Sequence, residues 1–322
     1  MLLKILGQLL VATTLVQIVP VDASVFEYQA GVGKMEQTMM SPVESQMAFG
    51  TLPEAENRDY PVKIDLDSYG IVTSAWSAMV VDDSSGAVLF EKHPDALRSI
   101  GSVTKLMTAL VFLEQNPNLN EVVTLDPELD YVGGGRIYLG YFNGVSLYNV
   151  LGASLVGSDN TATQALVRFS GLSSVDFIAR MNQKADEMGM VQTDFYDVAG
   201  LDSNSMSTAR ELVRLLQEAE ANETISYFMQ QSTYTITQAS GRSVTIENTN
   251  GVLQTFMNES PYDVVGGKTG YLPQAGYVLI TSIKHEGNIV HVVIMGAESK
   301  DARVQEAKGL AYWAFQTYQW PE

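Results

Sequence analysis

A serine and a lysine stand three positions apart in Ser102-Val103-Thr104-Lys105, at the start of an apolar segment with helical character. Positions three apart share one face of an α-helix, so this spacing predicts a hydroxyl next to an amine. Such a pair is a nucleophile with its own base, provided that the amine is neutral. The start of a helix also offers free backbone N–H groups to a developing negative charge. Taken alone, the pattern favours a capping serine and a surface lysine, so the catalytic interpretation depends on partners elsewhere in the chain.

Two more polar stretches could supply those partners. Ser158-Asp159-Asn160 joins two segments with helical patterns, where it would either cap the second helix or present a hydroxyl and an amide at a cleft. Gly266-Gly267-Lys268-Thr269-Gly270 precedes an apolar strand pattern, and a turn is the simplest interpretation of its glycines. The end of a phosphate-binding P-loop is excluded, because Tyr262 stands where that motif requires a glycine.

The order Ser-x-x-Lys, Ser-x-Asn and Lys-Thr-Gly resembles the signature of penicillin-binding proteins and serine β-lactamases. Further segments are similar to the low-molecular-mass D,D-carboxypeptidases of this group. They are Ala199-Gly200-Leu201-Asp202 through Ser207-Thr208-Ala209-Arg210-Glu211-Leu212, Lys268 through Tyr277, and Met295-Gly296-Ala297. The resemblance covers roughly residues 69–318.

This resemblance implies an α+β fold of the β-lactamase/DD-peptidase kind. It has a five-stranded antiparallel sheet flanked by helices, a helical lobe, and an active site in the cleft between them. The hydrophobic pattern agrees, because strand-like segments enclose a long helical middle section. We expect strands at 75–82, 87–92, 277–283 and 289–297, a hairpin at 233–246, and helices at 102–115, 147–155, 161–169, 177–188, 208–219 and 301–318.

The resemblance also implies catalytic roles. Ser102 attacks the carbonyl between two D-alanines at the end of a peptidoglycan stem peptide, and Lys105 takes its proton. A free lysine has a pKa near 10.4, so Lys105 must be neutralised by burial or by a nearby cation, for which Lys268 is the candidate. Ser158 relays a proton to the leaving amine. Asn160 holds the substrate amide and orients Lys105.

Substrate binding falls, by the same resemblance, to the Lys-Thr-Gly segment. Lys268 and Thr269 bind the terminal carboxylate. The edge strand from Lys268 through Gly270 to Tyr271 pairs with the peptide backbone. The oxyanion is held by the N–H groups of Ser102 and Tyr271.

The predicted function is therefore that of a serine-type D-Ala-D-Ala carboxypeptidase, a hydrolase that works through an acyl-enzyme and is inhibited by β-lactam antibiotics. A D,D-endopeptidase that cuts cross-links is the nearest alternative, since the chain stops at Pro321-Glu322 where many carboxypeptidases continue into a second β domain. A class A-like β-lactamase is disfavoured, because no Glu-x-x-Leu-Asn segment lies between Asn160 and Lys268. A catalytically silent wall-binding protein is the alternative outside the enzymes.

Composition restricts the chemistry further. The formal net charge of −18 argues against a nucleic-acid partner, which would require a basic face. The absence of cysteine excludes disulfides and thiolate chemistry. His93, His285 and His291 are the only histidines, which argues against a metal site built on histidine but leaves carboxylate sites open. We expect no metal and no cofactor. We interpret all three as surface or core residues, not as members of a Ser-His-Asp triad.

The N-terminus predicts export. Lys4 precedes an apolar stretch at 5–19, and Val21-Asp22-Ala23 supplies small or apolar residues before a cleavage site at Ser24. We expect a signal peptide at 1–23, a flexible linker at 24–69 and the serine DD-peptidase domain at 70–318, located in the periplasm or cell-wall space. An uncleaved signal would instead anchor the chain in the membrane.

Overall fold

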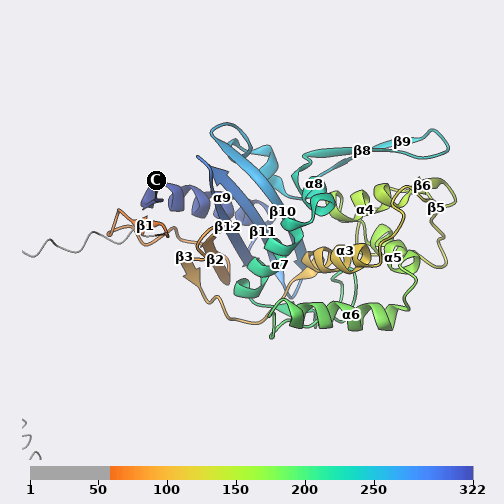
Figure 1. The fold of residues 1–322 in the computed structure, drawn as a ribbon, viewed down its shortest axis with the longest axis horizontal. Helices are drawn as coiled ribbons and strands as arrows, with labels where there is room; N and C mark the ends of the chain where they lie inside the picture. The colour runs from red at the N-terminus through yellow and green to blue at the C-terminus, as the bar shows by residue number, and fades with distance from the viewer. Residues whose placement is uncertain (1–58, 322) are drawn as a thin grey trace, which may run out of the picture. The chain divides into compact units, whose positions relative to one another are not determined.

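The computed structural model describes residues 59–321, and the predicted five-stranded antiparallel sheet is present (Figure 1). Both the predicted signal peptide and the linker up to residue 58 lie outside the described residues. The strands follow in the spatial order β10 (Tyr262–Leu272), β11 (Gly276–His285), β12 (Asn288–Ala297), β2 (Ser77–Asp82) and β3 (Val88–Lys92).

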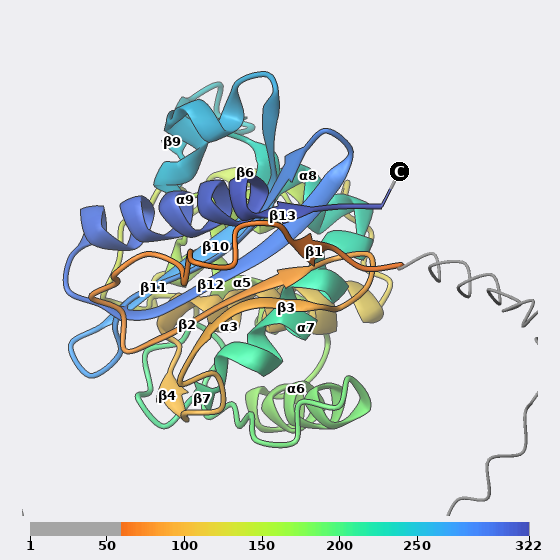
Figure 2. The ribbon, with the colours of Figure 1, turned by 90° about the vertical axis from the view of Figure 1, so that its left-hand side faces the viewer.

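The sheet pairs a strand from the early part of the described chain with a strand from its late part. Strand β12 pairs with β2, and Val292 lies opposite Val80. Both residues belong to the core beneath α9 (Lys300–Thr317), whereas their neighbours Met79 and Val293 belong to the core on the other face, beneath α7 (Ala209–Ala221). Figure 2 shows the two helices on opposite sides of the sheet. Because successive side chains of a strand alternate between faces, strands covered on both faces are apolar at nearly every position.

A helical lobe interrupts the sheet, as predicted. It consists of α3 (Thr104–Glu114), α4 (Leu147–Val156), α5 (Asn160–Phe169), α6 (Ser174–Glu187) and α8 (Glu223–Gln230), with the hairpins β5 (Val122–Thr124)–β6 (Gly144–Ser146) and β8 (Thr233–Thr237)–β9 (Ser243–Glu247). Strand β4 (Arg98–Ser99) pairs with β7 (Met206–Ser207). Helix α3 is buried at every position from Thr104 to Phe112, which makes it the centre of the lobe.

The described part of the predicted linker, residues 59–69, packs against the end of the chain as part of the fold. Strand β1 (Val62–Lys63) pairs with β13 (Tyr318–Gln319), and the indole of Trp313 donates a hydrogen bond to Ser68. Proline- and acid-rich composition therefore did not reveal a short strand held by the last residues of the chain. Across residues 59–321, the helices are too short or too polar to pass through a bilayer.

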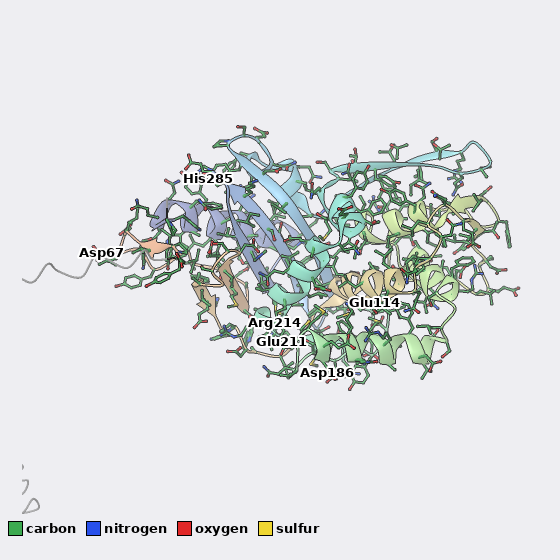
Figure 3. All side chains as sticks on the ribbon, in the orientation of Figure 1. Asp67, Glu114, Asp186, Glu211, Arg214 and His285 are labelled. Atoms are coloured by element: carbon green, nitrogen blue, oxygen red, sulfur yellow. The ribbon has the colours of Figure 1, made fainter. Side chains whose placement is uncertain are left out.

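The three histidines lie outside the predicted chemistry. His285 stacks on Tyr262 with ring centroids 4.3 Å apart, at the end of the sheet away from the lobe (Figure 3). His291 is fully buried and joins the hydroxyl of Ser282 to the carboxylate of Asp83, at 2.7 Å on each side. These are the residue types of a catalytic triad, but Ser282 and His291 have no exposed surface for a substrate to reach.

Glu220 on α7 completes this buried network. One of its carboxylate oxygens lies 3.8 Å from the His291 ring, and the other has no hydrogen-bond partner among the described residues. Burial raises the pKa of Glu220 to about 7 from 4.5, and the carboxylate of Asp83 adds to the effect. The folded protein therefore holds this proton at pH values where the unfolded chain has released it.

We expect Glu220→Gln to stabilise the protein more at pH 8 than at pH 5. Because the folded pKa of Glu220 is raised, wild-type stability falls as the pH rises from about 4.5 to about 7. The neutral glutamine removes this loss, which is on the order of 1–3 kcal/mol. Urea unfolding at both pH values measures the difference, with exposed Glu218→Gln on the same helix as the control. An effect of Glu220→Gln that is equal at both pH values would contradict the expectation.

Candidate active site

Ser102 lies on a tight turn that leads into the central helix of the lobe. The turn is a 3₁₀ helix, η1 (Gly101–Val103), and α3 begins two residues after Ser102. Gly101 adopts a φ of +54°, and a Cβ there would stand 2.7 Å from the backbone nitrogen of Tyr271. Only glycine allows both this backbone conformation and this close approach to β10.

The amine of Lys105 is buried beneath the Ser102 hydroxyl. Its Nζ atom lies 2.9 Å from Ser102 Oγ, 2.7 Å from Asn160 Oδ1 and 2.6 Å from the carbonyl oxygen of Ala199. The side chain has no exposed surface. In its neutral form the amine can donate both N–H groups to the oxygens of Asn160 and Ala199 and take the proton of the Ser102 hydroxyl with its lone pair.

Burial is the main influence on the charge of this amine. It lowers the pKa of Lys105 to about 7, against the opposing effect of Asp197 and Asp159. Burial also lowers the pKa of Lys268 well below its usual value, with smaller effects from Lys105 and Arg303. The chemistry requires a neutral Lys105, and burial, rather than the charge of Lys268, is the main cause of its lowered pKa.

The Ser158-Asp159-Asn160 stretch serves both of the purposes suggested by its sequence. Asp159 caps α5 by accepting a hydrogen bond from the N–H of Ala162. Ser158 has a left-handed φ of +57°, and its hydroxyl accepts a hydrogen bond from Lys268 Nζ at 2.9 Å. That conformation costs a non-glycine residue about 1–2 kcal/mol, and such strain concentrates at functional sites.

Strand β10 brings the Lys-Thr-Gly segment to the same place, at an edge of the sheet. Lys268 and Thr269 are buried, while Tyr271 is about half exposed. A Cβ at Gly270 would stand 2.1 Å from the carbonyl oxygen of Ile100 and 3.3 Å from the nitrogen of Ser102. The turn that carries Ser102 therefore packs directly against β10 at Gly270 and Tyr271.

These segments form one cleft of about 410 Å³. Of the eight residues predicted from the sequence, six line the cleft: Ser102, Ser158, Asn160, Thr269, Gly270 and Tyr271. The other two, Lys105 and Lys268, are buried and donate hydrogen bonds to the hydroxyls of Ser102 and Ser158. The structure thus brings all eight together.

Arg303 on α9 also lines this cleft, and the sequence motifs did not reveal it. It donates hydrogen bonds to the carbonyl oxygens of Gly270 and Val278, and its Nε atom has no partner among the described residues. Burial lowers its pKa to about 10. The available signal was its position, since Arg303 shares the buried face of α9 with Ala307 and Leu310.

Comparison with known proteins agrees with this geometry. Residues 68–299 match the model of a family described as D-alanyl-D-alanine carboxypeptidase. A D-alanyl-D-alanine endopeptidase of Haemophilus influenzae is 37% identical over 212 residues, which cover 66% of this chain and 71% of the relative. Another of Escherichia coli is 31% identical over 251 residues, with coverage of 74% and 76%.

A solved structure shares the fold. The DD-transpeptidase of Streptomyces K15 superimposes with a TM-score of 0.71 at 28% identity, covering 77% of this chain and 100% of that one. Together, the family match, the relatives and the shared fold show that the chain belongs to the D-alanyl-D-alanine carboxypeptidase family.

Proposed function

We propose that this protein is an exported serine D-alanyl-D-alanine carboxypeptidase that removes the terminal D-alanine of peptidoglycan stem peptides. The observation that carries the proposal is the buried Lys105 amine, with a pKa of about 7, at 2.9 Å from Ser102 Oγ. A neutral amine at this distance activates a serine without any histidine. β-Lactam antibiotics, which present a strained amide to the same serine, act as inhibitors.

In the first step, Ser102 Oγ attacks the carbonyl between the two D-alanines as Lys105 takes its proton. The negative charge on the carbonyl oxygen is stabilised by the N–H groups of Ser102 and Tyr271. As the C–N bond breaks, Ser158 relays this proton from Lys105 to the nitrogen of the leaving D-alanine, which leaves Lys105 neutral again, and the hydrogen bond from Lys268 holds the Ser158 hydroxyl in place. Water finally hydrolyses the acyl-enzyme.

The substrate carboxylate binds at the β10 end of the cleft. Lys268 lies beneath this end, Thr269 presents a hydroxyl, and Arg303 contributes a buried guanidinium. A carboxylate here favours the charged form of Lys268, whose pKa is lowered in the free protein. The free edge of β10 offers backbone hydrogen bonds to the extended peptide, which we expect to bind as an added strand.

A D,D-endopeptidase is the second candidate, because the two relatives named above are both D-alanyl-D-alanine endopeptidases. In that reaction the leaving group is the side-chain amine of a second stem peptide in place of free D-alanine. The steps at Ser102 and Lys105 are the same, so only the product separates the two activities.

The discriminating experiment compares a stem pentapeptide with a cross-linked peptide dimer as substrates of the full chain. We expect D-alanine to be released from the pentapeptide and release to stop after penicillin treatment. Dimer cleavage with a higher kcat/KM than pentapeptide hydrolysis would establish the second candidate instead. Failure to process either substrate, with no penicillin adduct, would exclude both.

We also propose that residues 1–23 direct the chain to the periplasm or cell-wall space, where its substrate is found, and that residues 70–318 form the catalytic domain. The apolar stretch after Lys4 and the cleavage-site residues before Ser24 support export. Mass spectrometry of the exported protein tests this assignment, because cleavage gives a chain that begins at Ser24, whereas an uncleaved N-terminus indicates a membrane anchor.

A further inference from the structure

The cleft carries more charge than a terminal D-alanine requires. The chain has 37 acidic and 19 basic residues, yet Arg136, Lys300 and Arg303 line the cleft with a single carboxylate, that of Glu247. A substrate with one terminal carboxylate needs the cationic end at Arg303 and no more. A terminal D-alanine supplies no partner for the remaining charged groups, Arg136, Glu247 and Lys300.

These charges divide between the two walls of the cleft. Lys300 lies three positions before Arg303 on α9, so both belong to the end that receives the terminal carboxylate. Arg136 and Glu247 belong to the lobe wall of the cleft, on the segment before β6 and at the end of β9, and their neighbours Tyr138 and Ile246 both lie against Gly157. This wall therefore presents one cation and one anion. Neither side chain forms a salt bridge with another residue of the segment 59–321.

The segment that carries Arg136 is fastened to the catalytic loop at both ends. The side-chain amide of Asn160 donates to the carbonyl oxygen of Gly133 at 2.8 Å. The N–H of Tyr138 donates to the carboxylate of Asp159 at 2.9 Å. The side chain of Arg136 is exposed, whereas Asn160 and Asp159 hold the backbone on either side of it.

Glu247 is positioned in a similar way by the two residues that follow it. Asn248 donates from its side chain to the carbonyl oxygen of Gln231 at 2.9 Å, and its N–H donates to Ser232. Thr249 accepts a hydrogen bond from Thr269 at 2.7 Å. These bonds hold the backbone of Glu247 at a fixed position relative to Thr269, in the segment that binds the terminal carboxylate.

We propose that Arg136 and Glu247 select a stem peptide whose third residue has both a carboxylate and an ammonium on its side chain. Arg136 pairs with the carboxylate and Glu247 with the ammonium. This inference rests on the proposed function and adds the substrate class. A third residue lies next to the acylated D-alanine, so an extended peptide on β10 brings its side chain within reach of the lobe wall. A side chain with only an ammonium would leave Arg136 unpaired in the complex.

The test uses two synthetic pentapeptides that differ only at the third residue, which is meso-diaminopimelate in one and lysine in the other. We expect wild-type kcat/KM to favour the diaminopimelate peptide by about ten-fold or more, the usual effect of one charge-assisted hydrogen-bonded pair. Arg136→Gln should lower kcat/KM about ten-fold for this peptide and less than two-fold for the lysine peptide. Glu247→Gln should lower both values, because both side chains carry the ammonium.

Matched controls separate selection from general charge effects. Arg242→Gln, at the exposed tip of the β8–β9 hairpin, and Glu259→Gln, also exposed, should leave the ratio of the two kcat/KM values unchanged. Arg136→Lys, which retains a cation, should recover part of the preference. Equal losses for both peptides in Arg136→Gln, or no preference in the wild type, would overturn the inference.

Failure of the proposed function gives a different result. Dimers cross-linked from the same two peptides serve as a second substrate pair. If only dimers are cleaved, their kcat/KM ratio is scored in the same way. If no peptide or dimer is processed and penicillin forms no adduct, the proposed function itself is wrong and the inference fails with it.

Discussion

Ser102→Ala is expected to abolish both acylation by penicillin and hydrolysis of the peptide, with kcat lowered about 10⁵-fold or more. Ser102 Oγ lies beside the Lys105 amine and next to the two N–H groups that would hold the oxyanion, so its loss removes the atom that forms the covalent bond. Intact-protein mass spectrometry after penicillin treatment should show one adduct on the wild type, in the peptide that bears Ser102. The variant should show none.

This experiment also tests a rival nucleophile. Ser158 and Lys268 form a second hydroxyl–amine pair, with the same distance of 2.9 Å. An adduct that persists in Ser102→Ala and maps to Ser158 would exchange the roles of the two serines. Ser240→Ala, at an exposed turn outside the cleft, should form the adduct at the wild-type rate. Equal melting temperatures would show that the Ser102 variant remains folded.

Helices and strands with a clear hydrophobic periodicity were predicted much better from the sequence than the segment that carries the Lys-Thr-Gly motif. Strand β12 and helix α4 fall within one or two residues of the expected positions. The glycines at 266, 267 and 270 indicated a turn, yet they lie inside the long strand β10. The reason is tertiary, since a side chain at Gly270 would clash with the carbonyl of Ile100. Only the family resemblance indicated an edge strand here.

A similar limit applies to local motifs on helices. Thr208 and Glu211 have the spacing of a capping box, and Thr208 caps α7 by accepting a hydrogen bond from the N–H of Glu211. The other half of the box is absent, because the carboxylate of Glu211 instead accepts hydrogen bonds from Thr193 and from the N–H of Gln192. The sequence identifies a residue able to cap, but the fold determines which buried donors compete for it.

The environment of Lys105 depends on contacts distant in the sequence. The spacing of Ser102 and Lys105 predicts their proximity, since it follows from helix geometry alone. The pKa of Lys105 is determined by burial and by Asp197 and Asp159, which lie more than fifty positions later in the chain. Sequence motifs therefore predicted which residues meet, while the ionisation that makes them reactive required the packed structure.

Acylation is expected to follow the ionisation of Lys105. Only the neutral amine accepts the serine proton, so kcat/KM should rise about ten-fold per pH unit below pH 7 and level off above it. An ordinary lysine, with a pKa near 10.5, would still show this rise at pH 9. The measurements are kcat/KM for pentapeptide hydrolysis and the second-order rate constant for penicillin acylation, from pH 5 to 9. A profile without a bend near pH 7 would contradict the assignment.

Lys105→Gln identifies the group responsible for this bend. The glutamine amide can still contact Asn160, but it cannot accept a proton, so we expect acylation to fall about 10³–10⁴-fold and the rise below pH 7 to disappear. Lys284→Gln, an exposed change at the far end of β11, should keep the wild-type profile. Lys268→Gln should weaken carboxylate binding and raise KM, yet keep the bend. If Lys268→Gln removes the bend and Lys105→Gln retains it, then Lys268 is the base for acylation, and the hydroxyl in contact with it, that of Ser158, becomes the nucleophile.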